Sequence, residues 1–251
     1  ELMTCLHLSD QMNLLKMILC RKISFLLCML LAVIPLTAQE KPVSDGTSCV
    51  PVRDVTFEDL AYGPGEKMYF TMHYKWGAIN SDATVELDTL TFNGQEAFCC
   101  KVNGRTTKFY DIFFKVREDF RSWFATDGLR PLKFTRDTQE GNYVAKNTYL
   151  YDWASADPHI DADVYSTSSG QRSLEIPLSR CTFDLPALFY FARNMDIDKV
   201  VPGKRYPMTF AIDDDVYNVY FILYGRETIK VRGLGTVNTI RFAAKLLAGE
   251  V

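Results

Sequence analysis

The stretch that decides the fold class is residues 67–76, which read KMYFTMHYKW. Large apolar side chains occupy every second position, beginning with Met68 and Phe70 and ending with Trp76, and most positions between them are polar. In an extended chain, successive side chains point to opposite faces, so residues that repeat at every second position share one face. The stretch therefore predicts a β-strand with one face against a core and the other in water.

Turn signals recur at short intervals around this strand. They are Gly63-Pro64-Gly65, Asn93-Gly94, Asn103-Gly104, Asp127-Gly128, Gly141-Asn142, Ser169-Gly170, Pro202-Gly203 and Asp213-Asp214-Asp215. Parallel strands would need helices between them, and almost no helical segment is available. We therefore expect an antiparallel all-β meander.

One substantial helix is expected, at residues 184–194. Asp184 can cap its start, Pro186 lies in its first turn, where a missing N–H costs nothing, and apolar residues repeat every three or four positions. A shorter helical turn is expected within residues 112–116. The predicted fold is mostly β: a strongly curved antiparallel sheet or incomplete β-barrel, with the 184–194 helix packed at an opening.

The first 39 residues predict a secretory signal peptide. Arg21 and Lys22 precede an apolar run over residues 23–36, which small residues close at Ala38. The run is too short for a membrane-spanning helix, which needs about 20 residues. We expect cleavage after Ala38, a periplasmic or secreted domain, and no permanent membrane anchor.

The remaining chain predicts a single domain. Residues 40–56 are polar and contain two prolines, which indicates a flexible lead-in to a β-rich domain over residues 57–251. The chain ends in an apolar stretch without a turn or a polar tail. We therefore expect the natural protein to continue beyond Val251.

Four cysteines lie in the expected domain and its lead-in: Cys49, Cys99, Cys100 and Cys181. Disulfides are possible in an exported protein, and four cysteines allow three pairings. The adjacent Cys99 and Cys100 would point to opposite faces of a strand, so a bond between them would be strained. We expect at least two buried free thiols.

Several segments together resemble the DUF3108 family of exported bacterial proteins. They are GEKMYF at 65–70, YKWG at 74–77, YDIFF at 110–114, VRED at 116–119, LRP at 129–131, and FDL at 183–185 leading into YFAR at 190–193. The resemblance covers residues 57–251 and implies an exported β-rich fold. It implies no reaction, because the family is defined by unknown function.

No constellation of residues predicts catalysis. His73 and His159 are the histidines of the expected domain, and no GxSxG motif accompanies them. Asp157, Asp161 and Asp163 flank His159, and their oxygens could bind calcium, but a solvated acidic strand end is the simpler interpretation. No catalytic residue, metal or cofactor is expected.

The aromatic content supplies the one candidate binding site. Rings between residues 98 and 124 and between residues 183 and 191 outnumber what one face of a thin sheet needs, although most are expected in the ordinary core. A curved sheet that does not fill its interior would enclose an apolar cavity. The predicted lining is Trp76, Phe120, Phe124, Phe189 and Tyr190.

The expected function is a non-enzymatic binding or scaffold module of the cell envelope. In one version it would hold an apolar or lipid-like ligand. In the other version its core would be solid, and it would dock an envelope protein through an exposed apolar patch or an open edge strand. The alternative is a hydrolase of envelope glycans or lipids, which needs carboxylates converging in a cleft. The formal net charge is −3 and the sequence has no basic stripe, which argues against nucleic acid as a partner.

Overall fold

The structure is a computed structural model, and it describes residues 49–52, 60–73, 80–179, 181–231 and 233–246. The expected signal peptide and most of the lead-in lie outside these residues. Two compact units divide the chain. The first, here called the sheet unit, comprises Val52–Asp196 and Thr209–Tyr217, and the second includes Ile197–Met208 and Asn218–Val251.

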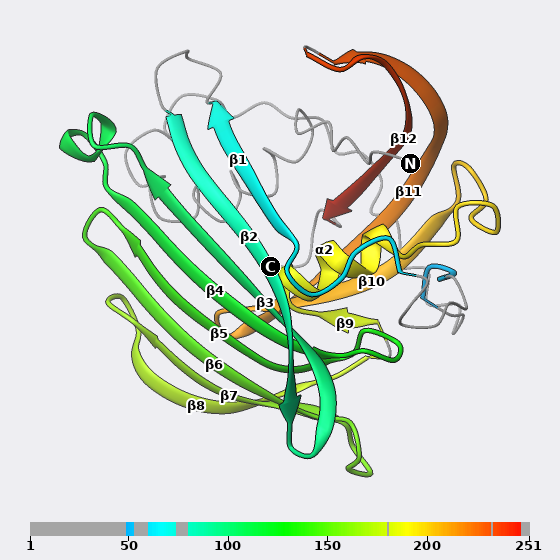
Figure 1. The fold of residues 1–251 in the computed structure, drawn as a ribbon. Helices are drawn as coiled ribbons and strands as arrows, with labels where there is room; N and C mark the ends of the chain where they lie inside the picture. Colours follow the sequence, from blue (N-terminus) through cyan, green and yellow to red (C-terminus); the bar gives the residue numbers. More distant parts are fainter. Residues whose placement is uncertain (1–48, 53–59, 74–79, 180, 232, 247–251) are drawn as a thin grey trace, which may run out of the picture. The chain divides into compact units, whose positions relative to one another are not determined.

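The sheet unit contains an eight-stranded antiparallel sheet in which each strand pairs with its neighbours in the sequence (Figure 1). The strands are β1 (Lys67–His73), β2 (Asn80–Phe92), β3 (Gln95–Thr106), β4 (Val116–Ala125), β5 (Pro131–Glu140), β6 (Tyr143–Asp152), β7 (His159–Ser166) and β8 (Gly170–Pro177). The sheet is curved, and β1 and β8 are its two edges, so it does not close into a barrel. The predicted antiparallel meander is confirmed.

Tight turns set this strand order. At the β2–β3 turn, Asn93 and Gly94 have positive φ values of 49° and 81°, and Phe92 pairs with Gln95. Two central residues with positive φ give the hairpin turn whose twist matches the flanking strands, and Asn-Gly favours it. The turn predicted at residues 103–104 is wrong, because pairing with β2 and β4 continues through them and keeps them in β3.

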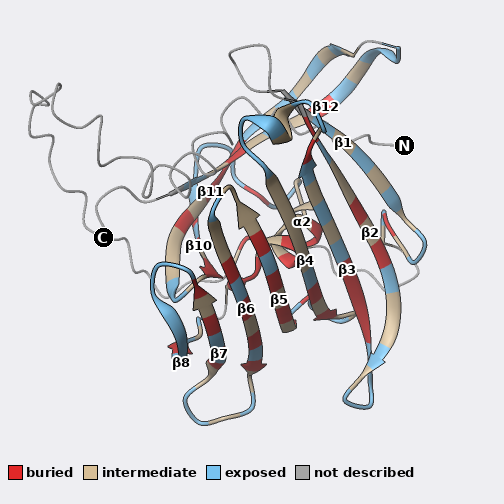
Figure 2. Cartoon of the chain, turned by 90° about the vertical axis from the view of Figure 1, so that its left-hand side faces the viewer, coloured by how far each residue is buried: buried red, intermediate tan, exposed pale blue. Residues whose placement is uncertain are grey.

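The alternation along each strand gives the sheet two faces, seen in Figure 2 as bands of buried and exposed residues. The first, here called the apolar face, carries buried side chains that include Leu87, Phe98, Phe124, Tyr149 and Ile160. The opposite face, here called the polar face, carries exposed ion pairs between neighbouring strands, such as Lys146 with Asp137. The core of the sheet unit therefore lies against one side of the sheet.

Helix α2 (Leu185–Arg193) confirms the predicted helix and packs against β3 and β4. The Asp184 carboxylate caps it by accepting from the backbone N–H of Ala187 at 2.9 Å. At its other end Arg193 donates to both carboxylate oxygens of Glu66, at 2.6 and 2.8 Å. A bidentate pair of this kind fixes orientation as well as distance, so the helix is held at both ends.

The predicted aspartate turn joins β10 (Arg205–Ile212) to β11 (Asp215–Val231) and is bonded to the apolar face. Asp213 has a φ of 57°, a conformation that aspartate tolerates in turns. Its carboxylate accepts from the buried Arg136 at 2.7 Å, and its carbonyl accepts from the Tyr149 hydroxyl at 2.5 Å. A buried guanidinium needs such a partner, and the turn supplies it.

A four-stranded sheet has the order β12, β11, β10, β9, with β9 at Thr182–Phe183 and β12 at Gly235–Leu246. β9 and β10 run parallel, which the antiparallel prediction did not include. The sequence predicts two strands in this region, at residues 216–224 and 227–232, but β11 is continuous from Asp215 to Val231. The register with β12 shifts by one residue between Leu223 and Gly225, and this β-bulge lets the strand continue past Tyr224.

The cysteines fall into two classes. Cys49 and Cys181 are disulfide-bonded, whereas Cys99 and Cys100 are free and buried. The expectation of two buried free thiols is therefore confirmed. Burial raises the pKa of Cys100 well above that of an exposed thiol, which makes it a poor nucleophile.

Candidate functional site

The predicted lining residues separate into two places. Phe124 and Tyr190 are fully buried and stack with their ring centroids 5.7 Å apart, and Phe189 meets Tyr190 edge-on at 5.3 Å. Phe120 lies elsewhere on the apolar face, with its ring centroid 6.1 Å from that of Phe134. Trp76 lies outside the described residues. Two of the five, Phe124 and Tyr190, thus pack as core, Phe189 is half-buried beside them, and the ligand cavity stays a prediction.

The acidic residues that the hydrolase alternative would use do not meet in one place. Asp161 and Asp163 are exposed on the polar face of β7, whereas Asp213 is bonded to the apolar face. Glu118 and Asp119 are consecutive in β4 and so point to opposite faces. The hydrolase alternative gains no support from these residues.

Among the described acids of the sheet, Glu118 has the pKa that is raised most. It accepts a hydrogen bond from the Thr138 hydroxyl, which in turn accepts from Arg136 Nε at 2.8 Å. Burial raises the pKa of Glu118 to about 8, so its carboxyl group is largely protonated at neutral pH. Since Arg136 also holds Asp213, these side chains fix the aspartate turn, which is a structural role.

An open groove of about 720 Å³ crosses the polar face over β1 to β5. Basic and acidic side chains alternate along it, and they form ion pairs such as Lys67 with Glu86 and Arg121 with Asp119. Charges of both signs leave no field of one sign to attract a polyanion. The groove is therefore a solvated surface rather than a phosphate-binding cleft.

The β3–β4 connection, residues 107–115, is here called the aromatic loop. It contains a 3₁₀ turn at Tyr110–Ile112, slightly earlier than the turn predicted within residues 112–116. Phe109, Ile112 and Phe113 are 63%, 78% and 74% exposed. Phe109 and Phe113 are thus exceptions to the expectation that most of the aromatic residues belong to the core.

Hydrogen bonds brace the base of the aromatic loop. Asp111 accepts from the Thr106 hydroxyl at 2.5 Å and from both terminal nitrogens of Arg117. The Thr106 hydroxyl oxygen also accepts from the backbone N–H of Val116, at 3.0 Å. Because both ends of the loop share these contacts, they restrain its base.

A second contact supports the far side of the aromatic loop. The Phe114 ring covers Gly141 in the β5–β6 turn, where an added Cβ would lie 2.9 Å from ring atom Cε2. The Gly141 N–H donates to the carbonyl of Lys115 at 2.7 Å. Phe114 is therefore the aromatic residue that anchors the loop, while Phe109, Ile112 and Phe113 face solvent.

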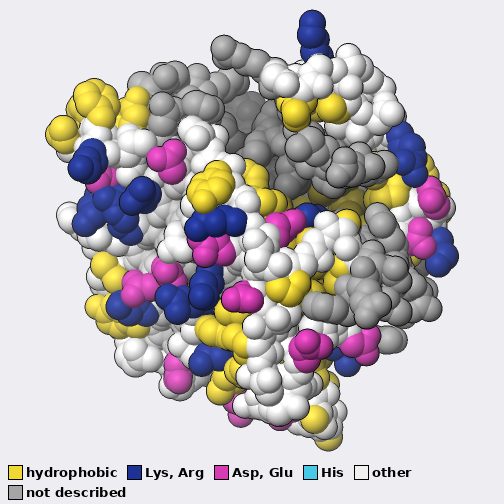
Figure 3. All heavy atoms as spheres, viewed as in Figure 1, with side chains coloured by type: hydrophobic (Ala, Val, Ile, Leu, Met, Phe, Trp, Pro, Cys, Tyr) yellow, Lys and Arg dark blue, Asp and Glu magenta, His cyan; other side chains and the backbone are white. Residues whose placement is uncertain are grey.

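Basic residues border the exposed apolar tip. Lys108 and Lys115 lie at its two ends, and both are exposed. Figure 3 shows hydrophobic side chains beside basic ones at the upper left, where the β3–β4 connection lies in Figure 1. Residues 108–115, KFYDIFFK, carry a visible sequence signal: two lysines enclose five apolar or aromatic residues, and Phe109, Ile112 and Phe113 follow the i, i+3, i+4 spacing of one helical face.

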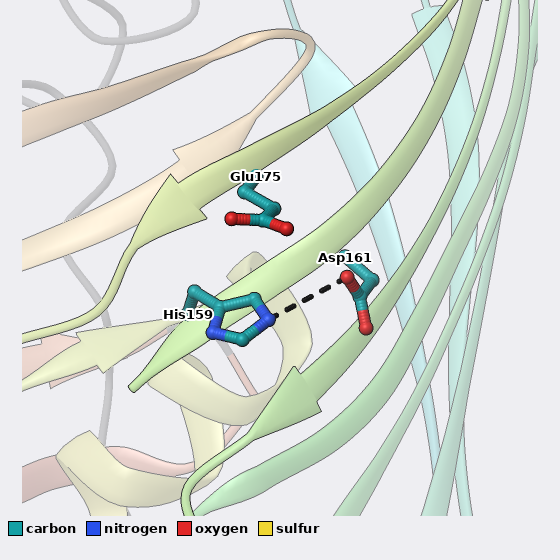
Figure 4. Close-up of side chains that lie close together, drawn as sticks. All are labelled: His159, Asp161 and Glu175. Carbon is teal, nitrogen blue, oxygen red and sulfur yellow. Dashed lines mark ion pairs between the residues drawn. The ribbon is translucent and has the colours of Figure 1, made fainter. Parts of the chain in front are cut away.

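A second cluster joins β7 and β8 on the polar face. His159 and Asp161 come from β7 and Glu175 from β8, and Figure 4 shows the three side chains gathered over these strands. Sequence reasoning placed Asp161 beside His159 but missed Glu175. The turn signal alone would not have found it: a two-residue turn at Ser169-Gly170 would place Asp161 opposite Leu178. In the structure Ser166 pairs with Gly170, and this register brings Asp161 opposite Glu175.

Comparisons with known proteins give one match. The family described as "Protein of unknown function (DUF3108)" matches residues 69–250. Searches of curated proteins and of solved structures found no match. In the part of the chain that the structure describes, no helix has both the length and the hydropathy needed to cross a membrane. The chain belongs to the DUF3108 family, a family of exported bacterial proteins whose function is unknown.

Proposed function

We propose that the protein is a non-enzymatic module of the cell envelope that docks reversibly on a membrane surface through the aromatic loop. The observation that carries this proposal is the exposed tip of Phe109, Ile112 and Phe113 between Lys108 and Lys115. Exposed apolar groups gathered in one place mark interaction sites. Aromatic residues bordered by lysine suit the boundary between acyl chains and anionic headgroups.

The charge pattern favours a lipid surface over a protein partner. Asp111 is the one acid of the aromatic loop, and Arg117 neutralises it. The loop therefore presents apolar side chains and positive charge, which complements a negatively charged membrane. A protein groove of matching shape is the competing partner, and the experiment below separates the two.

The expected affinity suits reversible docking. Moving Phe109, Ile112 and Phe113 out of water contributes roughly 4 to 5 kcal/mol in total, since none is fully exposed and none becomes fully buried. Each lysine adds about 1 kcal/mol near an anionic surface. The sum resembles the marginal binding of a single acyl chain, so a second contact would be needed for permanent attachment.

The predicted export signal would bring the domain, and with it the aromatic loop, to the outer side of a membrane. Cleavage near Ala38 would release the domain into the periplasm or the exterior. A module without a permanent anchor reaches a bilayer through a surface contact of this kind. The ligand-carrier version, with Phe120, Phe124, Phe189 and Tyr190 around a cavity, is less favoured because Phe124 and Tyr190 fill space against each other.

Vesicle co-sedimentation tests the proposal. The protein is mixed with vesicles of phosphatidylcholine alone or of phosphatidylcholine with phosphatidylglycerol. We expect binding to the mixed vesicles and weaker binding to the neutral ones. Phe109→Ala with Phe113→Ala should lower the partition coefficient about 100-fold, at about 1.4 kcal/mol for each ring.

The matched control is Tyr69→Ala, which removes an aromatic ring that is 72% exposed on β1, outside the loop. It should leave vesicle binding unchanged. Lys108→Gln with Lys115→Gln should abolish the preference for phosphatidylglycerol while keeping part of the binding. Absence of binding to either vesicle, or equal loss in the Tyr69 variant, would overturn membrane docking.

A further inference from the structure

Two carboxylates face each other across β7 and β8. Asp161 lies directly opposite Glu175 in the antiparallel register, and both side chains are exposed on the polar face. Like charges in directly opposite positions destabilise a strand pair. The arrangement is therefore one that a cation would stabilise.

His159 brings a nitrogen to the same place. It lies two residues before Asp161 in β7 and so shares its face. Its Nδ1 is 2.8 Å from the backbone carbonyl of Asp157. A carbonyl oxygen only accepts, so Nδ1 carries the hydrogen, and in the neutral ring Nε2 has the free lone pair.

This orientation is the one that metal-binding histidines adopt. In metal sites the second ring nitrogen commonly donates to a backbone carbonyl or a carboxylate, which fixes the tautomer and the direction of the ring. Here the lone pair of Nε2 is turned toward Asp161, at 3.6 Å from Oδ1 (Figure 4). That distance is too long for a hydrogen bond and leaves room for an ion between the two atoms.

The distances suit a small divalent ion. One ligand atom from each of the three residues lies within 4.8 Å of the others. Bonds of about 2.0 to 2.2 Å in a tetrahedral site separate ligand atoms by about 3.3 Å. Glu175 and Asp161 are exposed, and rotations about their side-chain bonds would bring the ligand atoms from these separations to the shorter ones of a tetrahedral site.

Neighbouring acids are committed to other contacts. Asp152 accepts from the backbone N–H groups of Ala154 and Ser155, at 2.9 and 3.0 Å. Asp163 accepts from the Ser173 hydroxyl. Within the described part of the chain, the carboxylates of Asp161 and Glu175 accept no comparable hydrogen bond, so these two acids retain their ligand capacity.

We propose that His159, Asp161 and Glu175 bind a divalent transition-metal ion of the Zn²⁺ type, with water completing the coordination. An imidazole nitrogen with two carboxylate oxygens suits zinc and its neighbours. Calcium prefers six to eight oxygen ligands, which this cluster does not supply. Because β8 is an edge strand, the ion has direct access from solvent.

Isothermal titration of the purified protein with Zn²⁺ tests the site. We expect one saturable site, with affinity that rises as the pH passes through the pKa of His159, since the proton on Nε2 competes with the ion. The Asp157 carbonyl and then Glu175, Asp161 and Asp152 raise that pKa. His159→Ala and Glu175→Gln should each weaken binding at least tenfold.

Asp163→Asn is the matched control, because it removes an exposed carboxylate from the same face of β7 while leaving the cluster intact. It should not change zinc affinity. Nitrogen NMR of the His159 ring supplies a second readout: Nε2 should shift on adding Zn²⁺ while Nδ1 keeps its hydrogen. Absence of saturable binding, or binding unaffected by both cluster variants, would overturn the site.

Discussion

Arg117 holds Asp111 across the base of the aromatic loop, with both terminal nitrogens of the guanidinium donating to the carboxylate and NH1 lying 2.9 Å from Oδ1. The contact has two effects. It fixes the 3₁₀ turn that presents Ile112 and Phe113, and it cancels the one negative charge of the loop. Both effects would favour docking on an anionic surface, because preorganisation reduces the entropy lost on binding.

Arg117→Gln should weaken vesicle binding although no apolar side chain is removed. The loop would lose its preferred conformation, and Asp111 would become an unpaired charge near the membrane. We expect a partition coefficient lower by about fivefold and a modest loss of stability at neutral pH, since the pair is partly exposed. Arg105→Gln is the control, since Arg105 lies opposite Arg117 in the register and outside the loop. Equal effects of the two variants would contradict a bracing role.

The same contact predicts a pH dependence. Hydrogen bonds from Arg117, and then from Thr106, lower the pKa of Asp111 from 3.8 to about 2. A carboxyl whose pKa falls on folding stabilises the protein above the unfolded pKa and loses that contribution as the pH falls toward the folded value. The free energy of unfolding of the native protein should therefore exceed that of Asp111→Asn above about pH 4, and the difference should shrink toward pH 2. A difference that stays constant over this range would refute the assignment.

Gly141→Ala should disturb the Phe114 anchor. Gly141 has a φ of 59°, and a new Cβ would meet the Phe114 ring at 2.9 Å. Gly128→Ala is the control, because Gly128 has a similar φ of 69° but no atom within 4 Å of the added Cβ. Chemical denaturation should show a loss of about 1 kcal/mol for Gly128→Ala and about 2 to 3 kcal/mol for Gly141→Ala. Equal losses would mean that Phe114 does not press on the turn.

Asp184 should make stability fall as the pH rises. It is fully buried, and burial raises its pKa from 3.8 to about 7. An acid whose pKa rises on folding binds its proton more tightly in the native state, so ionisation costs stability between these two values. Asp184→Asn keeps an acceptor for the Ala187 N–H and should remove this contribution to the slope. Asp184→Ala should cost about 1 to 2 kcal/mol through loss of the cap. A native slope unchanged in Asp184→Asn would contradict the assignment.

The strands and the helix were predictable because their signals are local. Alternation at residues 67–71 is confirmed, with Met68 and Phe70 half-buried between exposed neighbours. The Asn93-Gly94 turn and the Asp184 cap also depend on residues close in sequence. The continuous β11 was not predictable, because only pairing with β12 reveals that a bulge at Gly225 joins its two parts.

The site was harder to predict because long-range geometry decides it. Composition predicted that most of the aromatic residues belong to the core, but it could not single out Phe109 and Phe113 as the exposed exceptions. Phe124 and Tyr190 were selected as cavity-lining residues, and only the structure shows that they stack on each other. Glu175 required the β7–β8 register before it could be placed beside Asp161.

The most direct test of membrane docking measures whether the tip of the aromatic loop enters the bilayer. Ile112→Trp places an indole at a position that is 78% exposed in the native chain. After subtraction of the native tryptophan signal, we predict that its emission shifts to shorter wavelength on adding phosphatidylcholine and phosphatidylglycerol vesicles, and that brominated acyl chains quench it. Emission that stays unshifted and unquenched at saturating lipid would contradict the proposed function.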